Sequence, residues 1–262
     1  MASGEQIWAQ AWSEPESGSD LASLRSTATK TDRGWLLNGQ KIWSSRAPFA
    51  DMGFGLFRSD PSAERHRGLT YFMFDLKAPG VTVRPIVQLG GDTGFGEIFL
   101  DDVFVPDEDV IGTPNDGWRA AMSTSSNERG MSLRSPARFM AVAERLVQLW
   151  KANGSPPEFA DRVADGWIKA QAYRLQTFGT VTRLAGGGEL GAESSVTKVF
   201  WSELDVALHQ TALDILAADA ELTGPWTDGL LFALGGPIYA GTNEIQRNII
   251  SERLLGLPRE KK

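Results

Sequence analysis

The residues of this chain that could do chemistry are carboxylates, serine hydroxyls and tryptophans rather than thiols or metal-binding imidazoles. The 262 residues include no cysteine, which excludes disulfide and thiolate chemistry. Neither of the two histidines, His66 and His209, is followed four residues later by a second metal-binding residue, so a zinc site is disfavoured. A Ser-His-Asp triad is disfavoured by the same scarcity of histidine. We therefore expect no bound metal.

The composition is that of a globular protein. Hydrophobic residues make up 42% of the chain and charged residues 23%, and no apolar run approaches the roughly 18 residues of a membrane helix. The polar start, Met1 to Gln6, lacks the basic and apolar regions of a secretory signal. A soluble, cytoplasmic protein without membrane contacts is the simplest interpretation. The formal net charge of -7 argues against a general nucleic-acid binder.

The pattern of apolar residues changes near residue 115, and the two parts together predict an α+β fold class. Between residues 10 and 112, short apolar runs are separated by Asp, Pro and Gly, which is typical of a small antiparallel β-barrel or sandwich. We expect this β-domain over 1–114. Asn38-Gly39 lies between two short apolar runs and predicts a hairpin turn there.

From Gly117 the pattern becomes helical, with apolar residues recurring every three or four positions. Pro136 should kink or break the first helix, and Asn153-Gly154 should end it. A glycine-rich link separates the second and third helices. We expect a bundle of about four helices over 115–262. The expected helices span roughly 117–153, 157–185, 194–222 and 242–255.

Four motifs, taken in order, resemble the acyl-CoA dehydrogenase family. They are AWSEPESGSDLASL (11–24), NGQKIWSS (38–45), EIFLDDVFVP (97–106) and AGTNEIQRNIISERLLGLPRE (240–260). Each motif alone is weak, but their order over nearly the whole chain is specific. In that family a glutamate removes the α-proton of an acyl-CoA thioester while the β-hydride passes to FAD, which leaves a trans-2-enoyl-CoA.

The resemblance implies flavin contacts in the β-domain. A flavin ring is flat, so it needs an aromatic or apolar wall with short hydrogen-bond donors beside it. Trp43 would be the wall, and Ser13 and Ser45 would place hydroxyls at the edge of the ring. The alternative is that Trp43 merely packs against its own strand.

The first motif implies further contacts. Gln10 and Trp12 would make main-chain contacts to the flavin. Gly18 and Ser19 form a turn at which the backbone can closely approach a phosphate or the pantetheine arm of the substrate. The alternative is that residues 14–18 are only a polar loop.

The motifs indicate the catalytic base less directly than the flavin contacts. Many family members read Tyr-Glu-Gly-Thr, with Glu as the base, where this chain has Tyr239-Ala240-Gly241-Thr242. Some members, including isovaleryl- and long-chain-type dehydrogenases, place the base on the first long helix of the C-terminal domain. The resemblance then implies Glu128 as the base, directly followed by Arg129. The alternative is that Glu128 and Arg129 are a solvated pair on a helix face.

The thioester oxygen must also be polarised for the α-proton to leave. In the family, the backbone N–H at the residue before Gly-Thr does this together with a ribityl hydroxyl of FAD. That donor would be the N–H of Ala240, which survives the loss of the glutamate side chain. Thr242 and Glu244 would border the cofactor, and Ser19, Arg129 and Tyr239 would contact the substrate.

Two family features are missing. A block of helices precedes the S-E-P motif in family members, whereas here that motif starts at residue 13, so we expect an amino-terminally truncated form. Family homotetramers bind the ADP half of FAD with R-x-x-F-G and Q-x-x-G-G-x-G segments, but the corresponding residues, 149–157 and 212–224, contain neither. This resembles bacterial two-gene dehydrogenases, several acting on steroid-side-chain CoA thioesters, in which unlike subunits share one flavin.

We therefore expect an FAD-dependent acyl-CoA dehydrogenase that pairs with a homologous subunit in a heterotetramer, or with itself in a homotetramer. Electron-transfer flavoprotein is the expected electron acceptor. A non-catalytic partner subunit is the alternative, although the missing ADP motifs count against one that lends ADP-binding donors. A DNA-binding offshoot of the family is disfavoured by the acidic charge. Oxidase activity and the identity of the acyl chain are not encoded in any of these motifs.

Overall fold

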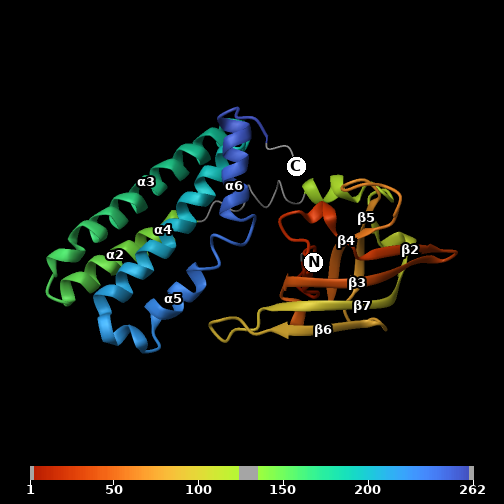
Figure 1. The fold of residues 1–262 in the computed structure, drawn as a ribbon, viewed down its shortest axis with the longest axis horizontal. Helices are drawn as coiled ribbons and strands as arrows, with labels where there is room; N and C mark the ends of the chain where they lie inside the picture. Colours follow the sequence, from red (N-terminus) through yellow and green to blue (C-terminus); the bar gives the residue numbers. More distant parts are fainter. Residues whose placement is uncertain (1–2, 124–134, 260–262) are drawn as a thin grey trace. The chain divides into compact units, whose positions relative to one another are not determined.

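The computed structural model describes residues 3–123 and 135–259, which form two compact units, Met1–Asn127 and Glu128–Lys262 (Figure 1). The first unit is built around a β-sheet and the second is helical. The α+β fold class predicted from the sequence is therefore confirmed. No helix among the described residues has the length and apolar character needed to cross a membrane.

The strands of the first unit form one sheet in the order β6-β7-β3-β2-β4-β5-β8, and β1 pairs with β4. The pairs are antiparallel except β1 with β4 and β2 with β4, which run parallel. Large apolar side chains, including Phe57, Phe72 and Ile98, fill the core of the unit. The strands are β1 (Trp8–Ala11), β2 (Thr27–Thr31), β3 (Gly34–Ser45), β4 (Met52–Arg58), β5 (Leu69–Asp75), β6 (Val81–Ile86), β7 (Phe95–Pro106) and β8 (Val110–Ile111).

The hairpin turn predicted at Asn38-Gly39 is wrong. Strand β3 runs through this pair, and the turn between β2 and β3 lies at residues 32–33. Gly39 has a φ of 141°, and the pairing of β3 with β7 shifts register between Leu37 and Gly39. The Asn38 side chain accepts a hydrogen bond from the Asp102 N–H at 2.9 Å. The Asn-Gly pair thus makes a bulge, because pairing on both sides of β3 outweighs the local turn preference.

Gly39→Ala should destabilise the β-unit by about 1 to 3 kcal/mol. An added Cβ would lie 2.2 Å from Ser26 Oγ and 2.8 Å from Ser26 Cα, in a backbone conformation that favours glycine. Hydrogen exchange of slowly exchanging β3 amides measures the loss for this unit alone. Gly91→Ala is the control, since Gly91 also has a positive φ but no atom within 4 Å of its added Cβ. Equal losses in the two variants would contradict the packing argument.

The helical unit follows the predicted order, with one addition. Helix α2 begins at Pro136, with Ser135 as its N-cap, so the break predicted at this proline is confirmed. The short helix α5 was missed, because α4 ends at Leu216 and the intervening residues break the apolar period. A π-helical turn, Ile250–Leu254, extends the last helix. The helices are α2 (Pro136–Ala152), α3 (Ala160–Ala185), α4 (Glu193–Leu216), α5 (Pro225–Ala233) and α6 (Asn243–Ile249).

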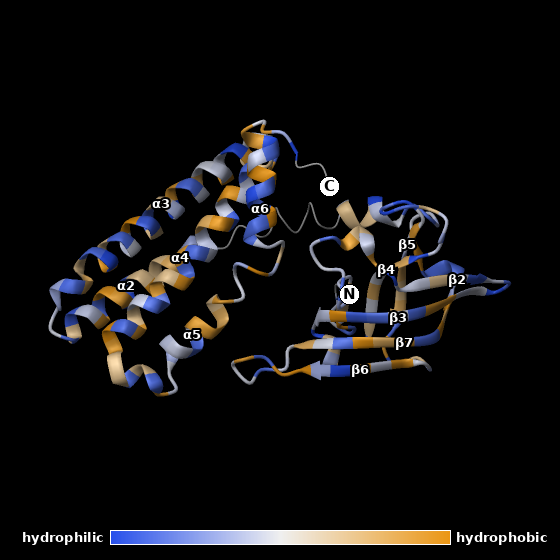
Figure 2. Cartoon of the chain, in the orientation of Figure 1, coloured by the Kyte–Doolittle hydropathy of each residue, from blue (hydrophilic) through white to orange (hydrophobic). Residues whose placement is uncertain are grey.

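The core of this unit lies between α2, α3 and α4. Its buried side chains include Phe139, Tyr173 and Trp201, and the rings of Phe139 and Tyr173 meet edge to face at 5.1 Å. Each of these three helices carries both hydrophobic and hydrophilic residues along its length (Figure 2). For α2 and α3 this is the pattern of helices that bury one face, whereas α4 buries polar side chains such as Lys198 and Asp205 together with apolar ones. Helix α4 also carries the contacts that hold α6, described below.

Candidate functional site

Trp43 lies near the end of β3 with its side chain 56% exposed. Its φ of 58° is left-handed, and the pairing of β3 with β7 shifts register between Lys41 and Ser44. The indole meets the ring of Phe95 edge to face, at 6.1 Å between centroids. At this irregular point of β3, a flat aromatic face is therefore exposed to solvent rather than packed into the sheet.

The structure brings two of the predicted hydroxyl residues to the same end of β3. Ser45 is exposed two residues beyond Trp43. Ser13 follows β1, and its carbonyl accepts a hydrogen bond of 2.8 Å from the N–H of Ile42, the residue before Trp43. The Oγ of Ser44 is buried and has no hydrogen-bond partner among the described residues. An aromatic face with nearby hydroxyls fits a flat ligand with polar edges such as a flavin.

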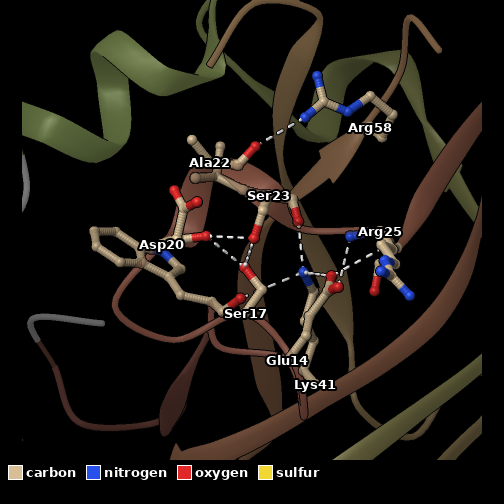
Figure 3. A network of polar contacts seen from close by, with 11 residues as sticks. Glu14, Ser17, Asp20, Ala22, Ser23, Arg25, Lys41 and Arg58 are labelled. Atoms are coloured by element: carbon tan, nitrogen blue, oxygen red, sulfur yellow. Dashed lines mark hydrogen bonds and ion pairs between the residues drawn. The ribbon is translucent and has the colours of Figure 1, made fainter. Parts of the chain in front are cut away.

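A buried ion pair supports the segment that contains Ser13 (Figure 3). Lys41 Nζ lies 2.8 Å from Glu14 Oε1, and the side chains are 0% and 8% exposed. Lys41 also donates to the Leu56 carbonyl at 2.7 Å, while Glu14 accepts from the N–H groups of Arg25 and Ser26 at 2.6 and 2.9 Å. The pair therefore joins the first motif to β3 and β4.

Both groups of the pair have shifted pKa values. Burial by itself would raise the pKa of Glu14, but the charge and hydrogen bond of Lys41 and the backbone donors hold it below its ordinary value. Burial lowers the pKa of Lys41, and Glu14 opposes this shift. Because the carboxylate is surrounded by donors, we assign the ionised form to both partners.

Gly18 and Ser19 lie in an exposed turn, as predicted. The hydroxyl groups of Ser17 and Ser23 both donate to the Asp20 carbonyl, at 2.8 and 2.7 Å (Figure 3). No atom lies within 4 Å of a Cβ built on Gly18, so its backbone can be approached closely from outside.

The other two predicted residues of the β-unit are less accessible. Gln10 is half-buried on β1, opposite Phe54 of β4. The indole of Trp12 donates a hydrogen bond of 3.0 Å to the Tyr71 hydroxyl and packs on a small apolar cluster of the unit. The side chain of Trp12 therefore has a structural role, and its main-chain carbonyl accepts a hydrogen bond of 3.5 Å from Lys41 Nζ.

In the helical unit, the predicted residues gather in the turn before α6. Ala240 has a left-handed φ of 54°, and it is exposed. Its N–H has no acceptor among the described residues. Thr242 is the N-cap of α6, and its hydroxyl accepts from the Ile245 N–H at 3.3 Å.

Two further predicted residues flank this turn. The ring of Tyr239 packs 6.1 Å from that of Trp201. Hydrogen bonds from its own N–H and from Thr242 lower the pKa of Glu244, which is exposed.

Asn243 attaches this turn to α4. Its Oδ1 accepts from Lys198 Nζ at 2.8 Å and from Ser202 Oγ at 3.1 Å, and its Nδ2 donates to Glu203 at 3.3 Å. Burial lowers the pKa of Lys198 to about 8, although Glu244 and Glu203 oppose the shift. The turn is therefore held by a buried polar network.

The helical unit should become more stable by about 1 to 2 kcal/mol between pH 7.5 and pH 9.5. Lys198 has a pKa of about 8 in the folded protein against 10.5 for an ordinary lysine. The unfolded chain therefore binds more protons in this interval, and raising the pH favours folding. Urea unfolding followed by helical circular dichroism should show the gain in the wild type and not in Lys198→Met. Equal pH slopes in the two proteins would contradict the assignment.

Glu128 and Arg129 lie outside the described residues, so their predicted roles stay predictions. His209 is buried, and its Nδ1 lies 2.8 Å from the Asp205 carbonyl oxygen, which gives it a partner within its own helix. Over residues 3–123 and 135–259, no group of three or more His, Cys, Asp or Glu side chains is arranged to hold a metal ion.

Comparison with known protein families identifies the class of protein to which this chain belongs. Residues 9–103 match the acyl-CoA dehydrogenase middle domain, and residues 115–255 match the acyl-CoA dehydrogenase C-terminal domain. The chain therefore belongs to the acyl-CoA dehydrogenase family, whose members are FAD-dependent oxidoreductases. The family predicted from the motif order is confirmed.

Three similar proteins are informative. Acyl-CoA dehydrogenase IpdE1 from Mycobacterium tuberculosis (strain ATCC 25618 / H37Rv) is 38% identical over 266 residues, which cover 98% of this chain and 68% of IpdE1. The solved Tcur3481-Tcur3483 steroid ACAD has a TM-score of 0.91 at 26% identity, over 98% of this chain and 70% of that chain. The ChsE4-ChsE5 complex from Mycobacterium tuberculosis has a TM-score of 0.88 at 27% identity, over 99% and 71%. The last two proteins are named as pairs of components.

Proposed function

We propose that this chain catalyses FAD-dependent α,β-dehydrogenation of an acyl-CoA thioester to the trans-2-enoyl-CoA, as one subunit of a heteromeric enzyme. Beyond family membership, one observation carries the proposal: the exposed ring of Trp43 is fixed at the end of β3 close to Ser13 and Ser45. Bound FAD supplies the acceptor for the hydride that leaves the β-carbon.

The residues of the β-unit hold and orient the cofactor in this proposal. Trp43 forms a wall against the ring, and the hydroxyl groups of Ser13 and Ser45 donate to its polar edge. The backbone of Gly18 stays free to approach a phosphate or the pantetheine arm. The other residues proposed to border the cofactor are Gln10, Trp12, Ser19, Thr242 and Glu244.

The helical unit supplies the proton transfer. Glu128 takes the α-proton, and the N–H of Ala240 donates to the thioester oxygen, which stabilises the negative charge that develops there as the proton leaves. Ser19, Arg129 and Tyr239 contact the acyl-CoA. The separation of base and oxyanion donor explains how a chain with alanine at position 240 can remain active.

A homologous partner subunit completes the cofactor site. The pyrophosphate of FAD needs cationic or N–H donors. Residues 149–157 lack the R-x-x-F-G segment and contain Lys151 as their one cation, and the indole N–H of Trp150 donates to the Pro156 carbonyl at 2.9 Å. Two-component relatives such as ChsE4-ChsE5 support an unlike subunit as the source of these donors. We propose an electron-transfer flavoprotein as the partner that would accept the electrons of the reaction.

The chain expressed alone should retain well under one FAD per subunit, because half of the cofactor contacts come from the partner. Co-expression with a homologous acyl-CoA dehydrogenase gene should give one FAD per unlike pair, together with enoyl-CoA formation. Flavin absorbance against protein concentration measures the first result, and mass spectrometry of the CoA products the second. A homotetramer of this chain with stoichiometric FAD would contradict the partner. A flavin-loaded pair without enoyl-CoA formation would favour the non-catalytic subunit.

A further inference from the structure

One side chain holds the turn that carries the proposed oxyanion donor. Gln246, buried on α6, donates from Nε2 to the Ala240 carbonyl at 3.1 Å and to the Gly241 carbonyl at 3.4 Å. A Cβ built on Gly241 would lie 2.6 Å from the same nitrogen, so the amide group and the turn fit closely. No other side chain among the described residues donates to these two carbonyls.

The turn needs such a restraint, because its backbone is strained. A left-handed conformation is unfavourable for a non-glycine residue, and Ala240 adopts it with a φ of 54°. The ends of the turn are fixed by backbone bonds, from the Tyr239 N–H to Gly235 at 3.0 Å and from the Asn243 N–H to Pro237 at 2.8 Å. Between those ends, the two peptide groups that follow Ala240 are held by Gln246 through the Ala240 and Gly241 carbonyls.

We infer that Gln246 is a positioning residue for the oxyanion donor: it fixes the two peptide groups that follow Ala240 and so holds the left-handed conformation in which the Ala240 N–H keeps the direction needed to reach a thioester oxygen. This inference rests on the proposed function, in which that N–H polarises the substrate. Gln246 itself touches neither substrate nor cofactor in the inference. Its effect is to keep the donor from relaxing, since a donor displaced by about 1 Å can cost roughly 100-fold in rate.

The test uses the FAD-loaded complex and crotonyl-CoA labelled with carbon-13 at C1, whose resonance reports how strongly the carbonyl is polarised. In the wild type, binding should displace this resonance downfield. Gln246→Met keeps the volume of the side chain but cannot donate, so the displacement should shrink and kcat should fall about 10- to 100-fold with KM within twofold. Arg247→Gln is the matched control, because Arg247 is the next residue of α6 and its salt bridge within the described residues is to exposed Glu203.

A second variant separates donation from folding. Gln246→Glu places a carboxyl group against two carbonyl oxygens, where burial raises its pKa. This group can donate to the carbonyls when it is protonated and repels them when it is ionised at higher pH. Its carbon-13 displacement should therefore recover on acidification, whereas that of the wild type should not change. A normal displacement in Gln246→Met would overturn the positioning role and leave the proposed function standing. No displacement in the wild type would overturn the donor role of Ala240 itself.

Discussion

Replacing Glu128 by glutamine should lower the rate of enoyl-CoA formation by about 100- to 10,000-fold, the usual contribution of a general base. Glutamine has the size and polarity of glutamate but cannot accept a proton at neutral pH. FAD content should stay unchanged, because the cofactor contacts proposed above come from other residues. The measurement is single-turnover bleaching of the flavin absorbance by an acyl-CoA that the complex oxidises, at saturating substrate.

Glu144→Gln provides the comparison for this experiment. Glu144 is an exposed glutamate of α2, and within the described part of the chain its carboxylate accepts from Gln148 alone, so its substitution should leave the rate within twofold. Turnover in Glu128→Gln equal to that of the wild type would exclude Glu128 as the base. Loss of FAD together with activity would instead give Glu128 a structural role.

The second large effect concerns the ion pair of Glu14 and Lys41. Lys41→Met should destabilise the β-unit by about 3 to 5 kcal/mol, because it leaves a buried carboxylate without its counter-charge. Glu14→Gln should destabilise the β-unit by a similar amount. The double variant should lose clearly less stability than the sum of the two single losses, since neither partner then carries an unpaired charge. Hydrogen exchange of slowly exchanging β3 amides measures each loss.

Acid should weaken the same unit. The pKa of Glu14 is lowered in the folded protein, so its contribution is complete above the unfolded value of 4.5 and is lost as pH falls through the lower, folded value. Glu14→Gln should lack this part of the acid sensitivity. Lys77→Met removes the exposed pair with Asp51 and should cost under about 1 kcal/mol. If Lys41→Met and Lys77→Met lowered the stability of the β-unit by equal amounts, the argument from burial would be refuted.

Several features of this protein were predictable because they depend on residues close together in the sequence. The change of period near residue 115 gave the order of sheet and helices, and Pro136 marked the start of α2 because proline suits only the first turn of a helix. Thr242 marked the start of α6 for a similar local reason, since its hydroxyl caps the helix. The order of the motifs indicated the family.

Other features depend on contacts between distant parts of the chain. The Asn38-Gly39 pair has a strong local preference for a turn, yet it lies within β3 because the neighbouring strands pair with both sides of it. Glu14 and Lys41 are 27 residues apart, and nothing in their spacing indicates that both are buried.

The sequence alone therefore determined the family, the order of the elements and the residues predicted to meet flavin and substrate. Only the tertiary structure decided that Trp43 is exposed, that Glu14 and Lys41 form a buried pair, and that Gln246 holds the turn at Ala240. The physical reason is that periodicity and capping act within a few residues. Burial, and the pairing of charges and donors that it enforces, is fixed only when distant segments pack together.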